Sequence, residues 1–224
     1  MLRWLKEQGL SLFFLAIFLA ALIGQSVFGL LAYNEDQLSH GAPPVSYIEF
    51  VTSSDFVVDV AENWQSEYLQ FFLLILATIW LVQKGSTESK QPGQEGIESD
   101  EEQDIRGGAE SDSPRWARVG GWRTVVYSNS LLIVMGAIFV LSWAAQSVAG
   151  AASFSDEQVE HGEAAVSWAE YVVSPDFWNR TLQNWQSEFL AVGSMIAFSI
   201  YLRQRGSPES KPVGTAHDET SAEG

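Results

Sequence analysis

The sequence predicts an all-α integral membrane protein with four transmembrane helices, arranged as two tandem parallel two-helix repeats with structured outer helical segments. Three observations lead to this prediction. The chain holds four long apolar stretches, its second half repeats motifs of its first half 121 positions downstream, and lysines and arginines gather on one side of all four stretches. Together they indicate two membrane hairpins that cross a bilayer in the same direction.

The repeat is carried by short polar motifs that return without a gap. They are Gln-Ser-Val-x-Gly at 25–29 and 146–150, His-Gly at 40–41 and 161–162, Asn-Trp-Gln-Ser-Glu at 63–67 and 184–188, and Gly-Ser-x-Glu-Ser-Lys at 85–90 and 206–211. Because each half also carries two apolar stretches, the repeat predicts an architecture. It does not by itself predict a chemical activity.

The apolar stretches set the predicted spans. The stretch at about 10–32 carries no charge over about 23 residues, more than the 18 or so that mark a candidate transmembrane helix, and the one at about 130–152 is similar. The stretches at about 64–83 and 185–204 are shorter, and we expect spans there because they hold the same place in both copies. The first stretch is expected to be a retained anchor, since it is longer than a signal-peptide core and its counterpart lies mid-chain.

Composition divides the rest of the chain. The segment between the copies is rich in Glu, Asp, Ser and Gly, and buries too little apolar area to offset the cost of ordering. The predicted parts are membrane hairpin repeat 1 (copy 1) at 1–92, a disordered acidic cytoplasmic linker at 93–122, hairpin repeat 2 (copy 2) at 123–212, and a disordered tail at 213–224.

Basic residues predict the orientation. Lysines or arginines flank the predicted spans on the side of the termini and the linker, whereas Arg180 is the one basic residue in the two opposite loops. By the positive-inside rule both termini and the linker are cytoplasmic and the two loops face outward. Both copies then insert with the same polarity, as parallel repeats do.

The outer loops are expected to hold short helices. Ser46-x-x-Glu49 and Ser167-x-x-Glu170 match capping boxes, in which the serine and glutamate side chains satisfy each other's backbone N–H groups. Ser174-Pro175-Asp176 reads as a second helix start. We expect one helix from Pro175 to Gln204 that ends at Gly206, with Gly85 ending its counterpart.

Polar residues near the outer ends of the spans form the main candidate site. Amides and carboxylates are costly in lipid and usually face the interior of a helix bundle. Two symmetric clusters are predicted, which consist of Gln25, Ser26, Asn63, Ser66 and Glu67 in copy 1 and of Gln146, Ser147, Asn184, Ser187 and Glu188 in copy 2. Two interpretations stay open: a network that locks helices together, or a site for a cation, a proton or a lipid headgroup.

The histidines are weak candidates for a metal site. Asp36 and His40, like Glu157 and His161, are four residues apart and could offer oxygen and nitrogen ligands. A glycine follows each histidine, so a histidine that interacts with the negative end of a helix explains the pattern equally well. No metal is therefore predicted.

Composition and missing motifs exclude several classes of protein. The chain has no cysteine, which excludes disulfides, thiol nucleophiles and cysteine-ligated metal centres. Its net charge of −16 makes nucleic acid an unsuitable partner. The glycine spacings of phosphate loops and dinucleotide folds are missing, and no nucleophile–base pair is recognisable. We predict no cofactor and no catalytic residue.

The paired motifs resemble those of an uncharacterised family of prokaryotic membrane proteins, domain-of-unknown-function family 6766. The resemblance covers nearly the whole chain except the linker and tail, and is most specific at Asn-Trp-Gln-Ser-Glu-Phe-Leu (184–190) and Arg-Gly-Ser-Pro-Glu-Ser-Lys-Pro (205–212). Copy 1 departs from it at Thr87 and Tyr68. The resemblance implies a multi-pass protein of a prokaryotic cytoplasmic membrane and implies no activity or site residue.

Three function classes follow from the sequence. The first is a non-enzymatic structural or interaction protein of the cell envelope, whose partners are the lipid bilayer, its own copies or other membrane proteins. The second is a small channel or transporter subunit that uses the symmetric polar clusters. The third is a membrane metal-site protein or enzyme.

Overall fold

A computed structural model describes residues 2–221, without the side chains of Leu2 and Arg106. All regular structure in these residues is helical, which confirms the predicted all-α class. The elements are α1 Leu2–Glu7, α2 Gly9–Ser39, α3 Tyr47–Val51, α4 Ser54–Trp80, a 3-10 turn at Arg106–Gly108, α5 Arg115–Val119, α6 Gly121–Ser128, α7 Ser130–Glu160, α8 Trp168–Tyr171 and α9 Pro175–Tyr201.

The chain divides into two compact units. Unit 1 consists of Met1–Ala61 and Ala145–Val172, and unit 2 of Glu62–Ala144 and Val173–Gly224. The long helices α4 and α7 each contribute one part to each unit.

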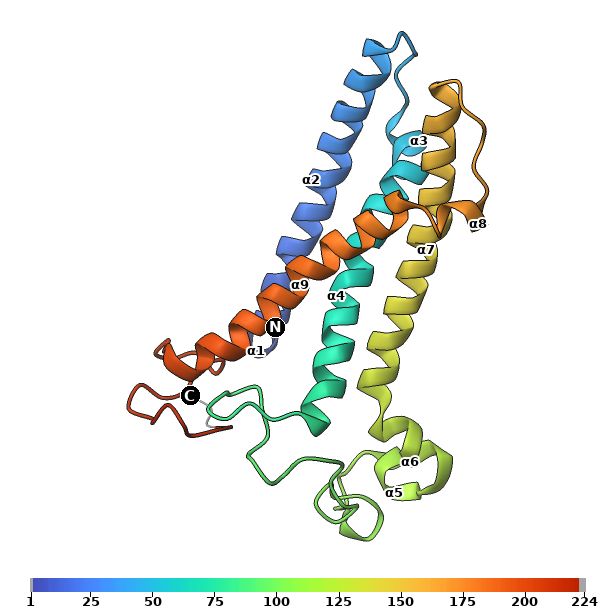
Figure 1. Ribbon diagram of the computed structural model, residues 1–224. Coiled ribbons are helices and arrows are strands. Elements are labelled where there is room, and N and C mark those ends of the chain that lie inside the picture. The colour runs from blue at the N-terminus through green and yellow to red at the C-terminus, as the bar shows by residue number, and fades with distance from the viewer. Residues whose placement is uncertain (1, 222–224) are drawn as a thin grey trace. The chain divides into compact units, whose positions relative to one another are not determined.

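In unit 1, α3 packs against the uninterrupted helix α2 after a short loop (Figure 1). Phe50 of α3 lies over Gly29 of α2, so closely that a Cβ atom on the glycine would be 2.8 Å from Phe50 Cζ. The Phe50 ring also lies 5.6 Å from that of Tyr33. Asn34 fixes the loop, because its side chain donates to Val45 O at 3.1 Å and accepts from Val45 N at 2.8 Å.

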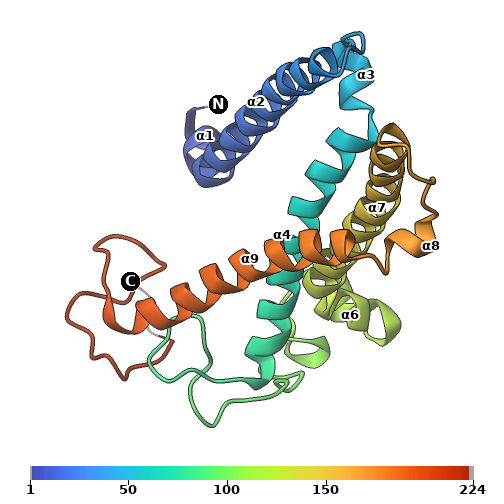
Figure 2. The ribbon, with the colours of Figure 1, turned by 45° about the horizontal axis from the view of Figure 1, so that its top comes forward.

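The other part of unit 1 has matching contacts 121 positions later. Tyr171 of α8 lies over Gly150 of α7, and its ring is 5.5 Å from that of Phe154. Ser155 takes the place of the loop asparagine, and its hydroxyl accepts from Val166 N at 3.1 Å. Figure 2 shows this loop and α8 beside the end of α7.

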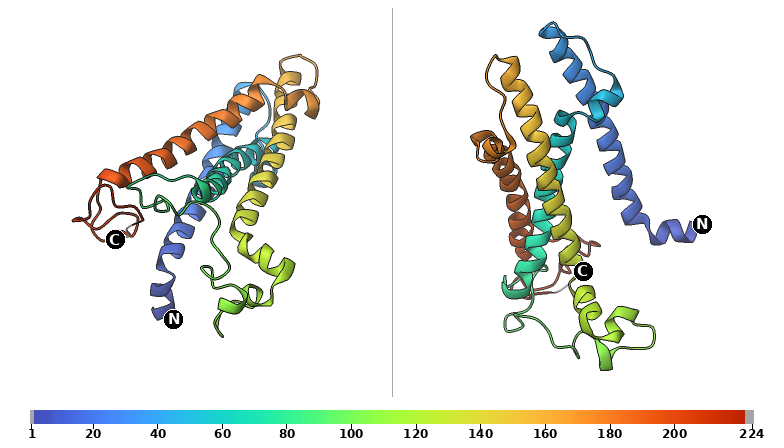
Figure 3. Two further views of the ribbon diagram at one scale, coloured as in Figure 1. Left: turned by 60° about the horizontal axis from the view of Figure 1, so that its bottom comes forward. Right: turned by 90° about the vertical axis from the view of Figure 1, so that its right-hand side faces the viewer.

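In unit 2, α9 crosses α4 and the first part of α7 contacts both (Figure 3). Gly136 of α7 faces Phe72 of α4, since a Cβ atom there would lie 3.0 Å from the ring. Trp143 of α7 packs against three rings of α9, with centroid distances between 5.9 and 6.3 Å; these rings are Phe177, Trp178 and Trp185. Aromatic packing therefore holds the helices of this unit together.

Two helices, α2 and α7, are long and apolar enough to cross a membrane. In the described chain, 6% of the most apolar window of α2 and 17% of that of α7 is buried. The predicted spans at 64–83 and 185–204 fall mostly within α4 and α9, which are less apolar. The four-span arrangement stays a prediction.

The end of α9 corrects one prediction. α9 spans Pro175–Tyr201, so it begins at the predicted residue but stops before Gln204 and well before Gly206. Leu202 is already extended, with φ −93° and ψ 156°, and the Gln204 N–H donates to Ser210 Oγ at 2.8 Å instead of to a helical carbonyl. Gly206, with φ 86°, belongs to the turn that follows. The end of α4 departs from prediction in the same way.

The linker contains local structure that the sequence did not predict. The 3-10 turn and α5 lie inside 93–122, and Arg118 of α5 donates to Ser111 O at 3.0 Å. The boundaries of the hairpins, linker and tail, and the disorder of the linker and tail, stay predictions.

Candidate functional site

The structure describes the members of each predicted polar cluster in two separate units. Gln25, Ser26, Gln146 and Ser147 belong to unit 1, and the remaining members belong to unit 2, namely Asn63, Ser66, Glu67, Asn184, Ser187 and Glu188. Each group has its own partners within its unit. Assembly of either complete cluster therefore stays a prediction.

In unit 1 the two serines bind aromatic side chains of the outer helices. Ser26 Oγ donates to Ile23 O at 2.8 Å and lies 2.9 Å from the Tyr47 hydroxyl, which must then be the donor of the second bond. Ser147 Oγ accepts from Trp168 Nε1 at 3.1 Å. Both serines are buried, so each contact ties a short outer helix to a long apolar one.

In unit 2 the two Asn-Trp-Gln-Ser-Glu motifs meet each other. Trp185 Nε1 donates to Gln65 Oε1 at 2.8 Å, and Gln65 Nε2 donates to Glu62 O at 3.1 Å. Gln65 is fully buried. The sequence predicted Gln65's neighbours as partners of Gln25 in the same copy, whereas the observed contact joins α4 of copy 1 to α9 of copy 2. We call this contact the α4–α9 crossing.

An ion-pair group lies one helical turn away along α4. Arg180 of α9 approaches Glu62 with Nη1 3.3 Å from Oε2, and approaches Asp176 with Nε 3.5 Å from Oδ2. Glu62 is the same residue whose carbonyl accepts from Gln65. The single basic residue of the outer loops therefore adds a second bridge between α4 and α9.

The other polar groups of the two motifs bind the backbone of their own helices. Ser66 Oγ donates to Asn63 O at 2.9 Å, and Ser187 Oγ donates to Asn184 O at 2.8 Å. The Asn184 amide donates to the carbonyl of the residue one turn earlier at 3.0 Å. Hydroxyls satisfied in this way can lie in an apolar environment at low cost. Glu67, which is exposed, and Glu188, which is half-buried, are the ionisable members of the motifs.

The histidines interact with the ends of their own helices. His40 Nδ1 lies 3.0 Å from Asp36 O, and 3.6 Å from the Asp36 carboxylate. His161 Nδ1 lies 2.8 Å from Glu157 O. A contact to a carbonyl requires Nδ1 to carry the proton, as a helix-end histidine does. Among the described residues no three His, Cys, Asp or Glu side chains form a group that could hold a metal ion.

Sequence reasoning missed a buried lysine after α9. Lys211 is 1% exposed, and its three ammonium N–H groups are shared among four backbone carbonyls that lie 2.7–3.2 Å from the nitrogen, those of Gly85, Ala216, His217 and Glu219. Every residue has a backbone carbonyl, so the spacing of residue types in the sequence could not predict these acceptors. The available signal was the repeated Gly-Ser-x-Glu-Ser-Lys motif, whose last residue this is.

Burial lowers the pKa of Lys211, and the nearby Arg203 guanidinium lowers it further. Lys90, 121 positions earlier, has a related but more open environment. It donates to Gly96 O at 2.6 Å and pairs with Glu98 at 2.5 Å, while its side chain stays 23% exposed. The two lysines therefore differ in how completely the chain surrounds them.

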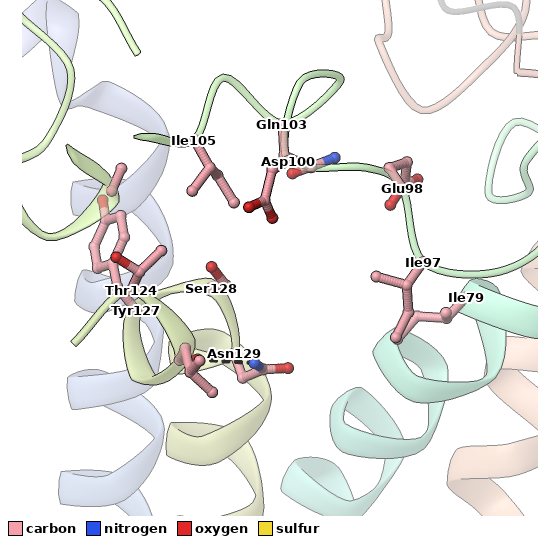
Figure 4. A pocket seen from close by; sticks show the side chains of 12 residues that line it. Ile79, Ile97, Glu98, Asp100, Gln103, Ile105, Thr124, Tyr127, Ser128 and Asn129 are labelled. Carbon is pink, nitrogen blue, oxygen red and sulfur yellow. Dashed lines mark hydrogen bonds between the residues drawn. The ribbon is translucent and has the colours of Figure 1, made fainter. Parts of the chain in front are cut away.

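A hollow of about 480 Å³ lies between the linker and the helices α4 and α6 (Figure 4). Ile79, Ile97 and Ile105 form part of its apolar lining, and the Asp100 carboxylate and the Ser128 hydroxyl point into it. Its size is within the range of small-molecule pockets. None of the predicted site residues lines it.

A family model with the description domain of unknown function (DUF6766) matches residues 1–222. No curated protein and no solved structure matches the chain. The matched range includes both copies of every motif described above.

Proposed function

Because the chain belongs to the domain-of-unknown-function family 6766, which carries no assigned activity, we propose a function from the structure. The protein is a multi-pass membrane protein of the cell envelope with a structural or interaction role. It holds its own copies or other membrane proteins together and catalyses no reaction.

The proposed topology has four spans in the plasma membrane of a prokaryote, as two parallel two-helix repeats with both termini inside. The exposed apolar surface of α2 supports it, because the described chain buries only 6% of the most apolar window of that helix. The recurrence of the same local contacts supports the repeats: Ser26 with Tyr47 and Ser147 with Trp168, each serine 21 positions before its partner.

The α4–α9 crossing is the observation that carries the structural role. Gln65 is fully buried and bonded to Trp185, and the motif serines bond their own helices. Polar groups that bind each other in this way lock helices together, at about 0.6–2 kcal/mol per contact in a membrane. A transport pathway would instead need such groups to face water or a substrate.

Capture of native complexes tests the proposed role. Tagged full-length protein, solubilised in a mild detergent and purified without crosslinker, should return a second copy or another membrane protein at a constant ratio in repeated preparations. Trp185→Phe should lower that recovery if the crossing shapes the binding surface. A monodisperse monomer with no reproducible companion would contradict the proposal.

A channel or transporter subunit is the second candidate, and Glu67 and Glu188 favour it. These carboxylates lie on the two helices that the crossing joins, close to a buried amide. Protein reconstituted into vesicles should then move ions or small solutes, and Glu67→Gln combined with Glu188→Gln should abolish the flux. Flux that the double variant leaves unchanged would remove these carboxylates from any transport role.

A further inference from the structure

The cytoplasmic ends of the two copies carry the same turn, in two different surroundings. We call Gly85–Lys90 turn 1 and Gly206–Lys211 turn 2. In turn 1 the Gln83 N–H donates to Ser89 Oγ at 2.8 Å, and the Glu88 N–H donates to Ser86 Oγ at 3.1 Å. In turn 2 the residues 121 positions later make the same two bonds at 2.8 and 3.2 Å. The two turns therefore present the same groups.

Turn 1 is covered by the tail segment 215–221, by Lys211 and by the end of α9, where Ser199 Oγ lies 3.3 Å from Ser86 Oγ. The Gly85 N–H donates to Thr220 Oγ1 at 2.8 Å, and the Gly85 carbonyl accepts from Lys211 Nζ at 2.7 Å. The Ser221 N–H donates to Ser86 O at 3.1 Å, and its hydroxyl donates to the carbonyl of Ser89. The views in Figures 1 and 3 show this segment against the loop after α4.

Turn 2 lacks such a cover in the described chain. Gly85 and Ser86 are buried, whereas their counterparts Gly206 and Ser207 are exposed and half-buried. No described atom lies within 4 Å of where a Cβ atom of Gly206 would be, and a hollow of about 310 Å³ lies along 204–213. The Gly206 and Ser207 side of turn 2 is therefore left open, whereas Ser210 and Lys211 of the same turn are buried.

A complementary segment is also exposed, the linker segment 94–100. Its counterpart in the tail, 121 positions later, shares its glutamate and its hydroxyl residue, so Glu98 and Ser99 correspond to Glu219 and Thr220. Both segments wrap around the lysine of the preceding turn, since Lys90 donates to Gly96 O as Lys211 does to His217 O. Ser99 is exposed, whereas Thr220 is 6% exposed.

The linker segment stays at the end of its own helix. The Gly96 N–H donates to Ile79 O of α4 at 2.7 Å, and the Lys90 side chain holds the same residue from the other side. In the tail, His217 Nδ1 lies 3.0 Å from Ile200 O of α9, so the tail segment also stays at the end of its own helix. Turn 1 binds the tail segment in that position. The linker segment is thus fixed to the end of α4, and turn 2 of the same molecule is fixed to the end of α9. A turn that binds the linker segment is therefore supplied by a second molecule.

We propose that the linker segment of one molecule docks on turn 2 of a second molecule, as the tail segment docks on turn 1 within each molecule. The contact within the chain is heterologous, because the turn of the first repeat binds the segment that follows the second repeat. Each contact leaves one free turn and one free segment per pair of molecules, so repeating it closes a ring or extends a row. The inference rests on the proposed interaction role and identifies the partner as a second copy of this chain.

Disulfide trapping tests the inference cleanly, because the chain has no cysteine of its own. Ser207→Cys and Asp100→Cys are placed on separate, differently tagged full-length chains that are expressed together and oxidised in native membranes. These positions correspond to Ser86 and Ser221, whose backbones are joined by a 3.1 Å hydrogen bond within the chain. We expect a covalent heterodimer that reductant dissolves.

Three controls make the outcome decisive. Ser86→Cys with Ser221→Cys in one chain should form a disulfide within the monomer, which shows that the covered turn has folded. Asp112→Cys, an exposed linker position, should not crosslink to Ser207→Cys and so reports random collision. Lys90→Met should lower the heterodimer yield about ten-fold, since it removes charge-assisted bonds that order the linker segment.

Other outcomes overturn the inference. It fails if the control pair closes and the Ser207/Asp100 pair gives no heterodimer, or if the Asp112 control crosslinks equally well. It also fails if a chain with both Ser207→Cys and Asp100→Cys closes its disulfide within one molecule. Native capture that returns a different membrane protein without a heterodimer would sink this inference and leave the proposed interaction role standing.

Discussion

At the scale of single residues, an aromatic ring packs so closely on each glycine of the two Gln-Ser-Val-x-Gly motifs that a larger residue does not fit. A Cβ atom on Gly29 would lie 2.8 Å from Phe50 Cζ, and one on Gly150 would lie 2.5 Å from the Tyr171 hydroxyl. Tyr171 is 1% exposed, so its ring has little room to move. The motif therefore needs glycine for close packing and not for an unusual backbone angle.

Gly29→Ala and Gly150→Ala should each lower the free energy of unfolding by about 1–3 kcal/mol, the usual effect of overpacking a closed contact. Gly24→Ala in the same helix as Gly29 is the matched control, since no described atom lies within 4 Å of the added carbon. Thermal unfolding of the purified protein in detergent measures all three. An equal loss in the Gly24 variant would show that the helix, and not the aromatic contact, sets the cost.

Replacing Lys211 should detach the tail segment 215–221 from turn 1. Lys211→Met roughly keeps the length of the side chain but removes the three N–H groups that four carbonyls share, and a hydrogen bond to a charged group contributes about 1.5–3 kcal/mol. We expect faster hydrogen exchange at 215–221 and faster proteolysis there. Lys84→Met is the control, because its exposed pair with Asp218 at 3.5 Å should contribute little.

At the scale of elements, the outer helices α3 and α8 depend on capping boxes. The Ser46 N–H donates to Glu49 at 2.7 Å and the Ser167 N–H to Glu170 at 2.9 Å, and these serines lower the pKa of both carboxyls below the usual 4.5. A carboxyl group whose pKa is lowered in the folded state stabilises the fold at pH values above its usual pKa. That stabilisation is lost as the pH falls below 4.5 through the lowered pKa.

Acid should therefore loosen α3 and α8 selectively. We expect hydrogen exchange at Ser46 and Ser167, corrected for the intrinsic effect of pH, to accelerate as the pH drops below 4.5. Glu49→Gln and Glu170→Gln keep a side-chain acceptor without a titrating charge, so the acceleration should vanish in them. If the Gln variants respond to acid as the wild type does, other carboxyls control these helices.

The α4–α9 crossing makes a prediction about a helix pair. Trp185→Phe keeps an aromatic ring and leaves Gln65 Oε1 without its donor, which should lower the free energy of unfolding by about 0.6–2 kcal/mol. Adding Gln65→Leu should recover part of that loss, because the unsatisfied amide is gone. Trp64→Phe is the matched control at the equivalent position, where the side chain is 40% exposed and a smaller loss is expected.

The elements also show where sequence reasoning succeeds. Local chemistry predicted the start of α9 at Pro175 and both capping boxes, because those signals lie within one turn of the residue they affect. The pairing of Gln65 with Trp185 was missed, since periodicity identifies an apolar face but not the helix it meets. The contacts of Lys211 were missed because their acceptors are backbone carbonyls, which any residue provides.

At the scale of the whole molecule, the number of spans decides on which side of the membrane each copy lies. α2 and α7 are apolar enough to cross a bilayer, whereas α4 and α9 begin with charged residues and are less apolar. If only α2 and α7 cross, the loops after them lie on opposite sides. If all four helices cross, both loops lie outside, and the linker returns to the side of the N-terminus.

Single cysteines in this cysteine-free chain can separate the two arrangements. We expect Ala42→Cys and Glu163→Cys to react with a membrane-impermeant maleimide in intact cells, and Gln91→Cys and Thr215→Cys to react only after permeabilisation. Positive charge flanks the spans on the inner side in this arrangement, so the insertion machinery favours it. Labelling of Ala42→Cys and Gln91→Cys from outside, with Glu163→Cys protected, would mean that only two helices cross. The two copies would then face opposite sides of the membrane, which contradicts the α4–α9 crossing and the contact of turn 1 with the tail. Neither a parallel repeat nor a contact between turn 2 and the linker of a neighbour could then exist.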